Sequence, residues 1–192
     1  MDELILCTGN TGKLAELRVL LPQHITLLSL PDVDLPTDLP ETGATLEANA
    51  LEKARYAFER TGLPCVADDT GLEVNALGGA PGVYSARYAG EARDAGSNMA
   101  KLLEELSGQA DRSARFRTVL ALITDQGEEV FEGTVEGTIA LVQKGVNGFG
   151  YDPLFIPKGY SGTFAELDPA LKNSMSHRSL AVRRLVAYLG RT

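Results

Sequence analysis

The sequence predicts an α/β protein with a mixed central sheet and flanking helices. In the first third of the chain, short apolar runs suited to buried strands alternate with helical patterns: residues 4–7 precede a helix expected over 13–21. Later, two alternating runs at 116–124 and 129–139 flank the turn-forming residues 125–127 and predict an antiparallel hairpin. Both patterns in one chain favour a mixed sheet with helices on both faces.

The other elements follow from the same periodicities. Thr45 is a candidate cap for a long helix over 45–60, which carries an alanine-rich apolar stripe. A third buried strand over 65–67 runs into Asp68 and Asp69, where we expect the strand to end. The remaining expected elements are a strand at 25–30, loops at 31–43 and 145–150, an irregular glycine-rich stretch at 72–89, a helix at 94–106, a short strand at 151–156 and a closing helix at 177–189.

Length and composition suit one globular domain that spans residues 1–192. The chain has 44% hydrophobic and 23% charged residues, which are ordinary values for a protein with a sizeable core. Its net charge of −8 argues against a nucleic-acid partner, although net charge does not determine the local potential at a site. No apolar stretch approaches the roughly 20 residues that span a bilayer, and no signal-peptide pattern opens the chain, so no membrane partner is expected.

The two cysteines, Cys7 and Cys65, lie in apolar, strand-like runs and are expected to be buried free thiols. The chain has no Cys-x-x-Cys motif, and its two histidines, His24 and His177, are far apart in sequence. A zinc site or a disulfide framework is therefore not expected, and the cytoplasm is the natural compartment.

The segment TGNTGK at residues 8–13 is the first candidate for chemistry. A strand runs into a glycine turn and then into a helix N-terminus, where exposed backbone N–H groups and the helix dipole favour a phosphate. Lys13 adds a positive charge, and Thr8 and Asn10 add polar side chains. The two glycines are too close together for a Walker A loop, so an ordinary strand-to-helix turn is the alternative.

Carboxylates form the second candidate. Asp68 and Asp69 follow a buried strand, at a position where α/β sheets place ligands, and side chains alternate along a strand, so the two acids should do different jobs. Glu41 could complete a hard-oxygen site for Mg²⁺, which takes one or two protein carboxylates together with phosphates and water. The alternatives are a solvated acidic turn for the aspartates and a surface acid for Glu41.

Aromatic and basic residues near the C-terminus form the third candidate. Phe149 lies on a glycine-flanked loop and could stack on a base, while Asp152 could accept a hydrogen bond from a ring N–H. Lys172, His177 and Arg178 could donate to carbonyl or phosphate oxygens. Core packing is the alternative for Phe149, and a place at a helix N-terminus is the alternative for His177.

Together these motifs resemble the inosine/xanthosine triphosphate pyrophosphatases, a family that hydrolyses non-standard purine nucleotides. The matching segments span nearly the whole chain in order. They are TGNTGKLAEL at 8–17, ETG at 41–43, ADDTGLEVNALGGAPGVYSARYAG at 67–90, GFGYDPLF at 148–155 and KNSMSHR at 172–178. Thr70 stands where a serine is expected and Asn75 where an aspartate is expected, and neither change removes a catalytic group.

The resemblance implies Mg²⁺-dependent hydrolysis of ITP, dITP and XTP to the monophosphate and pyrophosphate, which cleanses the nucleotide pool. Asp69 would be the proton acceptor and a ligand of one or more Mg²⁺ ions, with Glu41 and Asp68 as supporting metal residues. The family is typically a cytoplasmic homodimer of elongated two-lobed subunits with the active site in a cleft. The residues implied to contact the nucleotide are Thr8, Gly9, Asn10, Thr11, Gly12, Lys13, Lys53, Thr70, Phe149, Gly150, Tyr151, Asp152, Lys172, His177 and Arg178.

Three other functions share part of this pattern. A related pyrophosphatase could act on modified pyrimidine or methylated nucleotides, although the FGYD and SHR segments argue against it. A nucleotide sensor without catalysis would be expected to lack Asp69 or Lys13, and both are present. A P-loop kinase or ATPase is disfavoured by the glycine spacing.

Overall fold

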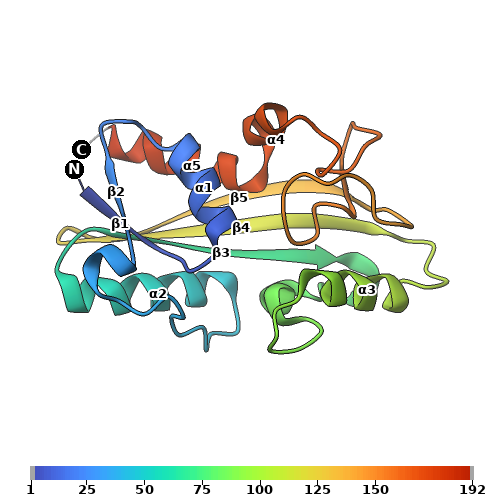
Figure 1. The fold of residues 1–192 in the computed structure, drawn as a ribbon, viewed down its shortest axis with the longest axis horizontal. Coiled ribbons are helices and arrows are strands. Elements are labelled where there is room, and N and C mark those ends of the chain that lie inside the picture. Colours follow the sequence, from blue (N-terminus) through green and yellow to red (C-terminus); the bar gives the residue numbers. More distant parts are fainter. Residues whose placement is uncertain (1–2, 191–192) are drawn as a thin grey trace. The chain divides into compact units, whose positions relative to one another are not determined.

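A computed structural model describes residues 3–190 of the chain. Over these residues the protein forms a six-stranded sheet in the order β2-β1-β3-β4-β5-β6, flanked by helices (Figure 1). The strands are β1 (Glu3–Cys7), β2 (Thr26–Ser29), β3 (Cys65–Val74), β4 (Ser113–Thr124), β5 (Gly127–Ile139) and β6 (Phe155–Pro157). The α-helices are α1 (Thr11–Leu20), α2 (Leu46–Thr61), α3 (Ala95–Glu105), α4 (Pro169–Met175) and α5 (His177–Leu189). None of these helices combines the length and apolar character needed to cross a bilayer.

The sheet is mixed, as predicted. β1 pairs in parallel with both β2 and β3, and β5 pairs antiparallel with β6. Only Asp125 and Gln126 separate β4 from β5, and a connection this short joins strands of opposite direction. The predicted α/β class and the hairpin are therefore confirmed.

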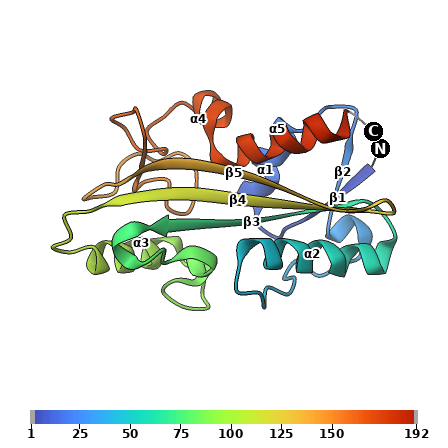
Figure 2. The same ribbon diagram turned by 180° about the vertical axis from the view of Figure 1, so that it is seen from behind.

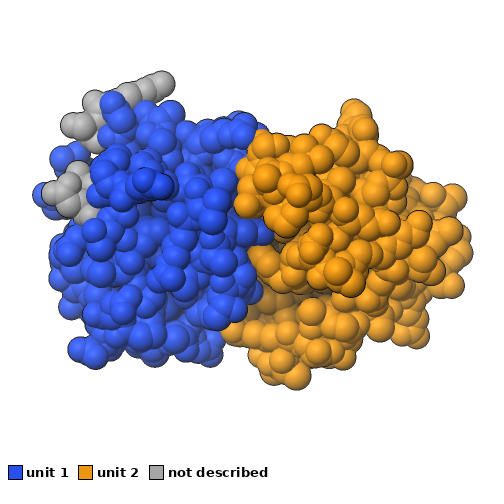
Figure 3. All heavy atoms as spheres, turned by 45° about the horizontal axis from the view of Figure 1, so that its top comes forward, with its two compact units in different colours: residues 1–69, 118–133, 178–192 blue, residues 70–117, 134–177 orange. Residues whose placement is uncertain are grey.

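The chain divides into two compact units (Figure 3). Unit 1 comprises residues 1–69, 118–133 and 178–192, and unit 2 comprises residues 70–117 and 134–177. The expectation of two lobes agrees with this division, whereas the cleft stays a prediction.

Unit 1 is a three-layer arrangement around the parallel strands. α1 and α5 cover one face of its part of the sheet and α2 covers the other (Figures 1 and 2). Ile5 of β1 is paired with Leu28 of β2 and with Cys65 of β3. Successive side chains of a strand alternate between the two faces of the sheet. On the α1 and α5 face, the core includes Leu4, Leu6, Leu17, Val66, Leu120, Leu122 and Leu185.

Unit 2 has its own apolar core. Leu102 of α3 and Phe116 of β4 belong to it, and the Phe116 ring lies 4.7 Å from the Phe155 ring between centroids. α3 lies on one face of this part of the sheet and α4 on the other (Figures 1 and 2). Both cysteines lie in unit 1 and are buried and free, as predicted.

Local start signals account for the helix positions. Asn10 caps α1 by accepting the Lys13 backbone N–H at 3.0 Å, so the helix begins at Thr11, two residues before the predicted start. Thr45 caps α2 by accepting the Ala48 N–H at 3.1 Å, as predicted. The closing helix over 177–189 is confirmed.

The expected end of the third strand is wrong. β3 continues through Asp68 and Asp69 to Val74, so both aspartates lie in the middle of a ten-residue strand. What ends at this point is the parallel pairing with β1, whose last paired residues are Cys7 and Ala67. β3 is also a neighbour of β4, so the strand does not need β1 beyond Ala67.

Two further expectations change in unit 2. The short strand expected over 151–156 is wrong for its first part, because residues 151–154 form turns and β6 begins at Phe155. The stretch 72–89 is irregular only after Val74, where the 3-10 helices Asn75–Leu77 and Gly82–Arg87 follow. The seven-residue helix α4 was not predicted.

Gly71→Ala tests how closely β3 approaches the 3-10 segment in unit 2. A Cβ at Gly71 would lie 2.7 Å from the Gly82 carbonyl oxygen, so backbone would have to shift. We expect the free energy of unfolding to fall by about 1–3 kcal/mol in urea denaturation. Gly96→Ala in α3 is the control, because its added Cβ would meet only an Asp94 oxygen at 3.4 Å, and we expect no loss of stability. Equal losses for the two variants would contradict this packing.

Candidate active site

The buried carboxylate of Asp68 joins three elements of unit 1. The Asp68 side chain is fully buried on β3, and its Oδ1 contacts Nζ of Lys13 from α1. Its Oδ2 accepts Nε–H of Arg178 from α5 at 2.7 Å. Arg178 also pairs with Glu16 of α1. The charges therefore alternate in sign along the series Glu16, Arg178, Asp68 and Lys13.

The residues of this network keep one another charged. Burial alone would raise the pKa of Asp68, but Arg178 and Lys13 outweigh it and hold that pKa far below its usual range. Burial alone would lower the pKa of Arg178, but Asp68 and Glu16 outweigh it and raise that pKa. Asp68 and Arg178 are therefore charged in the folded protein although both are buried.

Asp69 points to other partners, as the alternation of a strand requires. Lys53 of α2 lies with its Nζ 3.1 Å from Asp69 Oδ1, 2.6 Å from Glu41 Oε1 and 2.9 Å from the Asp68 carbonyl oxygen. Lys53 thus draws the two carboxylates together. The other oxygen, Oδ2 of Asp69, is buried and finds no hydrogen-bond partner within residues 3–190.

Burial and neighbouring charges shift the pKa values of the Asp69 and Lys53 side chains in opposite directions. Burial raises the pKa of Asp69, and the nearby Lys53 offsets this only in part. For Lys53 itself, burial would lower the pKa, but Asp69 and Glu41 outweigh burial and raise it. The cluster therefore holds one lysine that stays charged and one carboxylate with a buried oxygen that lacks a partner.

The segment at residues 8–13 forms the strand–turn–helix predicted from its sequence. Thr8 Oγ1 accepts the Asn10 backbone N–H at 3.1 Å, which shapes the turn. Residues 9–11 are exposed at the start of α1. Gly9 is required by packing, because an added Cβ would lie 2.5 Å from the Thr37 carbonyl oxygen. An anion-accessible helix N-terminus therefore lies beside the lysine that pairs with Asp68.

In unit 2 a second buried aspartate holds the aromatic loop. Asp152 Oδ2 accepts the Lys172 Nζ–H at 2.7 Å and the Phe149 backbone N–H at 2.8 Å. Nζ of Lys172 lies 5.2 Å from the centroid of the half-buried Phe149 ring. Gly148 has φ of 76°, and an added Cβ would come within 2.1 Å of Asp152 Oδ2, so only glycine fits there.

Other predicted residues of unit 2 pack into its interior. The Tyr151 hydroxyl donates to the Ser85 carbonyl oxygen at 2.9 Å. His177 stacks on Phe116 with ring centroids 4.6 Å apart and planes at 16°. Thr70 is half-buried on β3. Contact of these residues, and of Gly150, with a nucleotide stays a prediction.

The carboxylates can be compared with the needs of a metal. Within the described residues there is no group of three or more His, Cys, Asp or Glu side chains placed to hold a metal ion. Asp69 and Glu41 are a pair of hard-oxygen donors beside a single lysine. A protein site of two carboxylates suits Mg²⁺, which retains waters and binds substrate phosphates.

Comparison with known proteins identifies the family. A model of the Ham1 family matches residues 4–188. The chain belongs to the Ham1 family. It is 52% identical to a dITP/XTP pyrophosphatase of Porphyromonas gingivalis over 98% of each chain, and 47% identical to one of Christiangramia forsetii, covering 98% of this chain and 100% of that one.

Solved Ham1 structures have the same fold. A HAM1 protein from Coxiella burnetii matches with a TM-score of 0.92 and 42% identity, and each chain is covered completely. The Ham1 protein of Staphylococcus aureus matches with a TM-score of 0.90 and 39% identity, covering 99% of this chain and 100% of that one. The architecture of this Ham1 chain is therefore shared over its whole length.

Several residues that contact the candidate site were not predicted from the sequence. Glu16 lies three residues after Lys13, on the same side of α1, and that spacing was available as a signal. Asn49 and Glu52 of α2 bind the backbone of the segment at 41–43. They precede Lys53 by four residues and by one, but no local pattern indicates what they bind.

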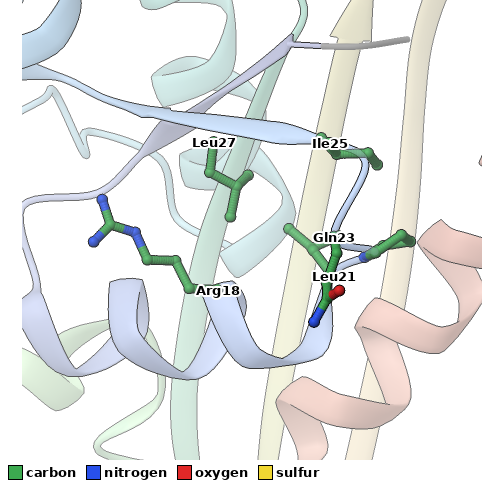
Figure 4. Close-up of a pocket in the computed structure, with 6 residues that line it drawn as sticks. Arg18, Leu21, Gln23, Ile25 and Leu27 are labelled. Carbon is green, nitrogen blue, oxygen red and sulfur yellow. The ribbon is translucent and has the colours of Figure 1, made fainter.

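A pocket elsewhere in unit 1 does not involve these residues. It encloses about 290 Å³ at the C-terminal end of α1 and the start of β2 (Figure 4). Its lining residues are Arg18, Leu21, Pro22, Gln23, Ile25 and Leu27. None of the predicted site residues lines this pocket, so it is not part of the candidate site.

Asp68→Asn tests the buried network. The substitution removes one of the two carboxylates that pair with the buried Arg178, and loss of one partner of a buried pair costs about 3–5 kcal/mol. We expect a loss of that size in the free energy of unfolding, measured by chemical denaturation at pH 7. Glu128→Gln is the matched control, because it breaks an exposed pair with Arg55, and exposed pairs contribute about 0–1 kcal/mol. A comparable loss in both variants would overturn the central role of Asp68.

Proposed function

We propose that this Ham1 chain hydrolyses the triphosphates of non-standard purines, dITP, ITP and XTP, to the monophosphate and pyrophosphate with Mg²⁺ as cofactor. The observation that carries the proposal is the cluster of Asp69, Glu41 and Lys53, in which one buried carboxylate oxygen lacks a partner. Relatives that are 45–52% identical are named dITP/XTP pyrophosphatases, which supports this substrate class.

The donor set suits Mg²⁺. Asp69 and Glu41 would hold the ion, which would polarise phosphate oxygens and acidify a bound water. Asp68 was expected to be a third metal residue, but Lys13 and Arg178 occupy its two oxygens. We therefore propose that Asp68 supports the site by positioning Lys13, in place of binding the metal.

The chain's own residues would perform the following steps. Lys13, the backbone N–H groups of Gly9, Thr11 and Gly12 and Lys53 would bind the triphosphate and neutralise its charge, which phosphoryl transfer chiefly requires. Asp69 would accept a proton from the water that attacks the α-phosphorus, in line with the departing pyrophosphate. Burial raises the pKa of Asp69. A bound Mg²⁺ ion would act in the opposite direction and favour the ionised form that can accept a proton.

Base selection would depend on unit 2. The half-buried Phe149 ring would stack on the purine, and Lys172 would donate to the 6-carbonyl that ITP and XTP share. ATP carries an amino group there, so two donors would face each other, and polar mismatches of this kind are rejected by roughly 10⁴–10⁵-fold. Arg178 was also expected to donate to the base. In the structure it pairs with Asp68 and Glu16, and its contact with the base stays a prediction.

The resemblance also leads us to propose a homodimer located in the cytoplasm. Two buried free thiols suit a reducing compartment. Sedimentation of the purified protein at a monomer mass would contradict the dimer.

Substrate turnover is the decisive measurement. We expect release of pyrophosphate and monophosphate from ITP, dITP and XTP with Mg²⁺, little from ATP, and none with a chelator. Release of pyrophosphate from every nucleotide, including ATP, would support the proposed hydrolysis but contradict the proposed selection of the base. No release from any nucleotide would reject the proposed function.

Asp69→Asn separates an enzyme from a nucleotide sensor. Loss of a positioned base typically lowers the rate about 10²–10⁴-fold, so kcat for ITP should fall by at least that amount. Binding of ITP, followed by calorimetry at raised Mg²⁺ concentration to offset the weaker metal site, should persist because Glu41, Lys13 and the loop at 8–13 are unchanged. Unaltered turnover in this variant would remove Asp69 from the catalytic role.

A further inference from the structure

Each residue of the segment 41–43 makes at least one polar contact with α2, and Thr42 makes two. These contacts involve both side chains and backbone groups. In order, Glu41 Oε1 lies 2.6 Å from Lys53 Nζ, the Thr42 N–H and hydroxyl donate to the two carboxylate oxygens of Glu52 at 2.7 and 2.8 Å, and the Gly43 N–H donates to Asn49 Oδ1 at 2.7 Å.

The helix presents these groups from a single face. Asn49, Glu52 and Lys53 are spaced at i, i+3 and i+4, which brings side chains to the same side of a helix. The segment runs in the opposite order, so each step along it meets a residue closer to the start of α2. Its register against the helix is therefore specified at three consecutive residues.

The backbone of residues 41–43 packs closely against α2. Asn49 is only 1% exposed, and a buried amide is costly unless it is hydrogen-bonded. A Cβ at Gly43 would lie 2.6 Å from the Ala48 Cβ and 2.8 Å from Asn49 Oδ1. No side chain fits between the segment and the helix, so Asn49 binds the backbone directly.

We propose that Asn49 and Glu52 are positioning residues that hold Glu41 in register beside Asp69 for the divalent cation, an inference that rests on the proposed function. Lys53 alone does not specify where Glu41 lies, because its Nζ is shared with Asp69 and the Asp68 carbonyl. The two bonds from Thr42 to Glu52 fix the residue next to Glu41. Loss of these bonds should lower the affinity for the cation. It should leave the phosphate-binding loop at 8–13 unchanged, because that loop makes none of these contacts.

Glu52→Ala tests the inference, with Mn²⁺ alone as the probe. Loss of hydrogen bonds worth one to two kcal/mol corresponds to about a 5–30-fold change, so we expect the Kd for Mn²⁺, measured by electron paramagnetic resonance, to rise about tenfold. The half-activating Mg²⁺ concentration should rise equally, with kcat recovered at saturating Mg²⁺. Asn49→Ala, which removes the acceptor for Gly43, should act in the same direction.

Glu59→Ala is the matched control, because Glu59 is an exposed glutamate of the same helix, two turns beyond Glu52. It should bind Mn²⁺ as the wild type does. If Glu52→Ala and Glu59→Ala have the same Kd, the positioning role is overturned. Where Glu52→Ala does not fold by circular dichroism, Glu52→Gln, which retains one acceptor oxygen, takes its place with a smaller expected rise, and an unchanged Kd again overturns the role.

Glu41→Gln distinguishes this inference from the proposed function. If Glu41→Gln weakens Mn²⁺ binding while Glu52→Ala does not, only the positioning role fails. If Glu41→Gln leaves Mn²⁺ binding unchanged, the cation site of the proposed function is wrong, and the positioning role is rejected with it.

Discussion

The pairing of the buried Asp68 carboxylate with Lys13 and Arg178 is the interaction on which the site in unit 1 depends. An unpaired charge at the depth of Asp68 and Arg178 would cost several kcal/mol, so the burial of these two groups depends on their ion pairs. The pairing holds Lys13 at the start of α1, next to the exposed turn of residues 9–11. It also occupies one face of β3, so the next residue, Asp69, is directed to Lys53 and Glu41 on the other face.

Unit 2 also contains a buried aspartate paired with a lysine, but there the aspartate orders a loop. Asp152 is buried and paired with Lys172, but its second bond goes to the backbone of Phe149 rather than to another cation. The carboxylate thereby fixes the loop that carries the aromatic ring. Gly148 permits this close approach, since any side chain there would meet the Asp152 carboxylate. In each unit a buried aspartate orders the neighbouring residues that are predicted to meet the nucleotide.

Local chemistry explains which parts of the structure could be predicted from the sequence. Strand alternation was enough to predict different roles for Asp68 and Asp69, and Thr45 could be recognised as a cap because capping involves residues close in the chain. The continuation of β3 was missed because its neighbour β4 lies about forty residues further along the chain. α4 was missed although Asp168 caps it and Pro169 opens it, a start signal that was present in the sequence.

Long-range ion pairs lie beyond such reasoning. Arg178 was predicted as a nucleotide contact because a guanidinium near the end of a motif suits a carbonyl or phosphate oxygen. Its observed partners, Glu16 and Asp68, are 162 and 110 residues away in the chain. No periodicity connects positions so distant. The metal role of Asp68 was expected for the same reason, since nothing local indicates that both of its oxygens are already paired.

Charge balance at the site also bears on how an acidic chain could bind a polyanion. The two clusters of unit 1 contain three cations, Lys13, Lys53 and Arg178, and each of them is already paired with carboxylates. The four carboxylates outnumber the cations, so these side chains alone do not provide a net positive charge for a triphosphate. Under the proposed function, Asp69 and Glu41 would hold the divalent cation, which would supply the missing positive charge for the triphosphate. Metal dependence would then follow from electrostatics as much as from the chemistry of the attacking water, because without the cation the substrate would meet a site of its own sign.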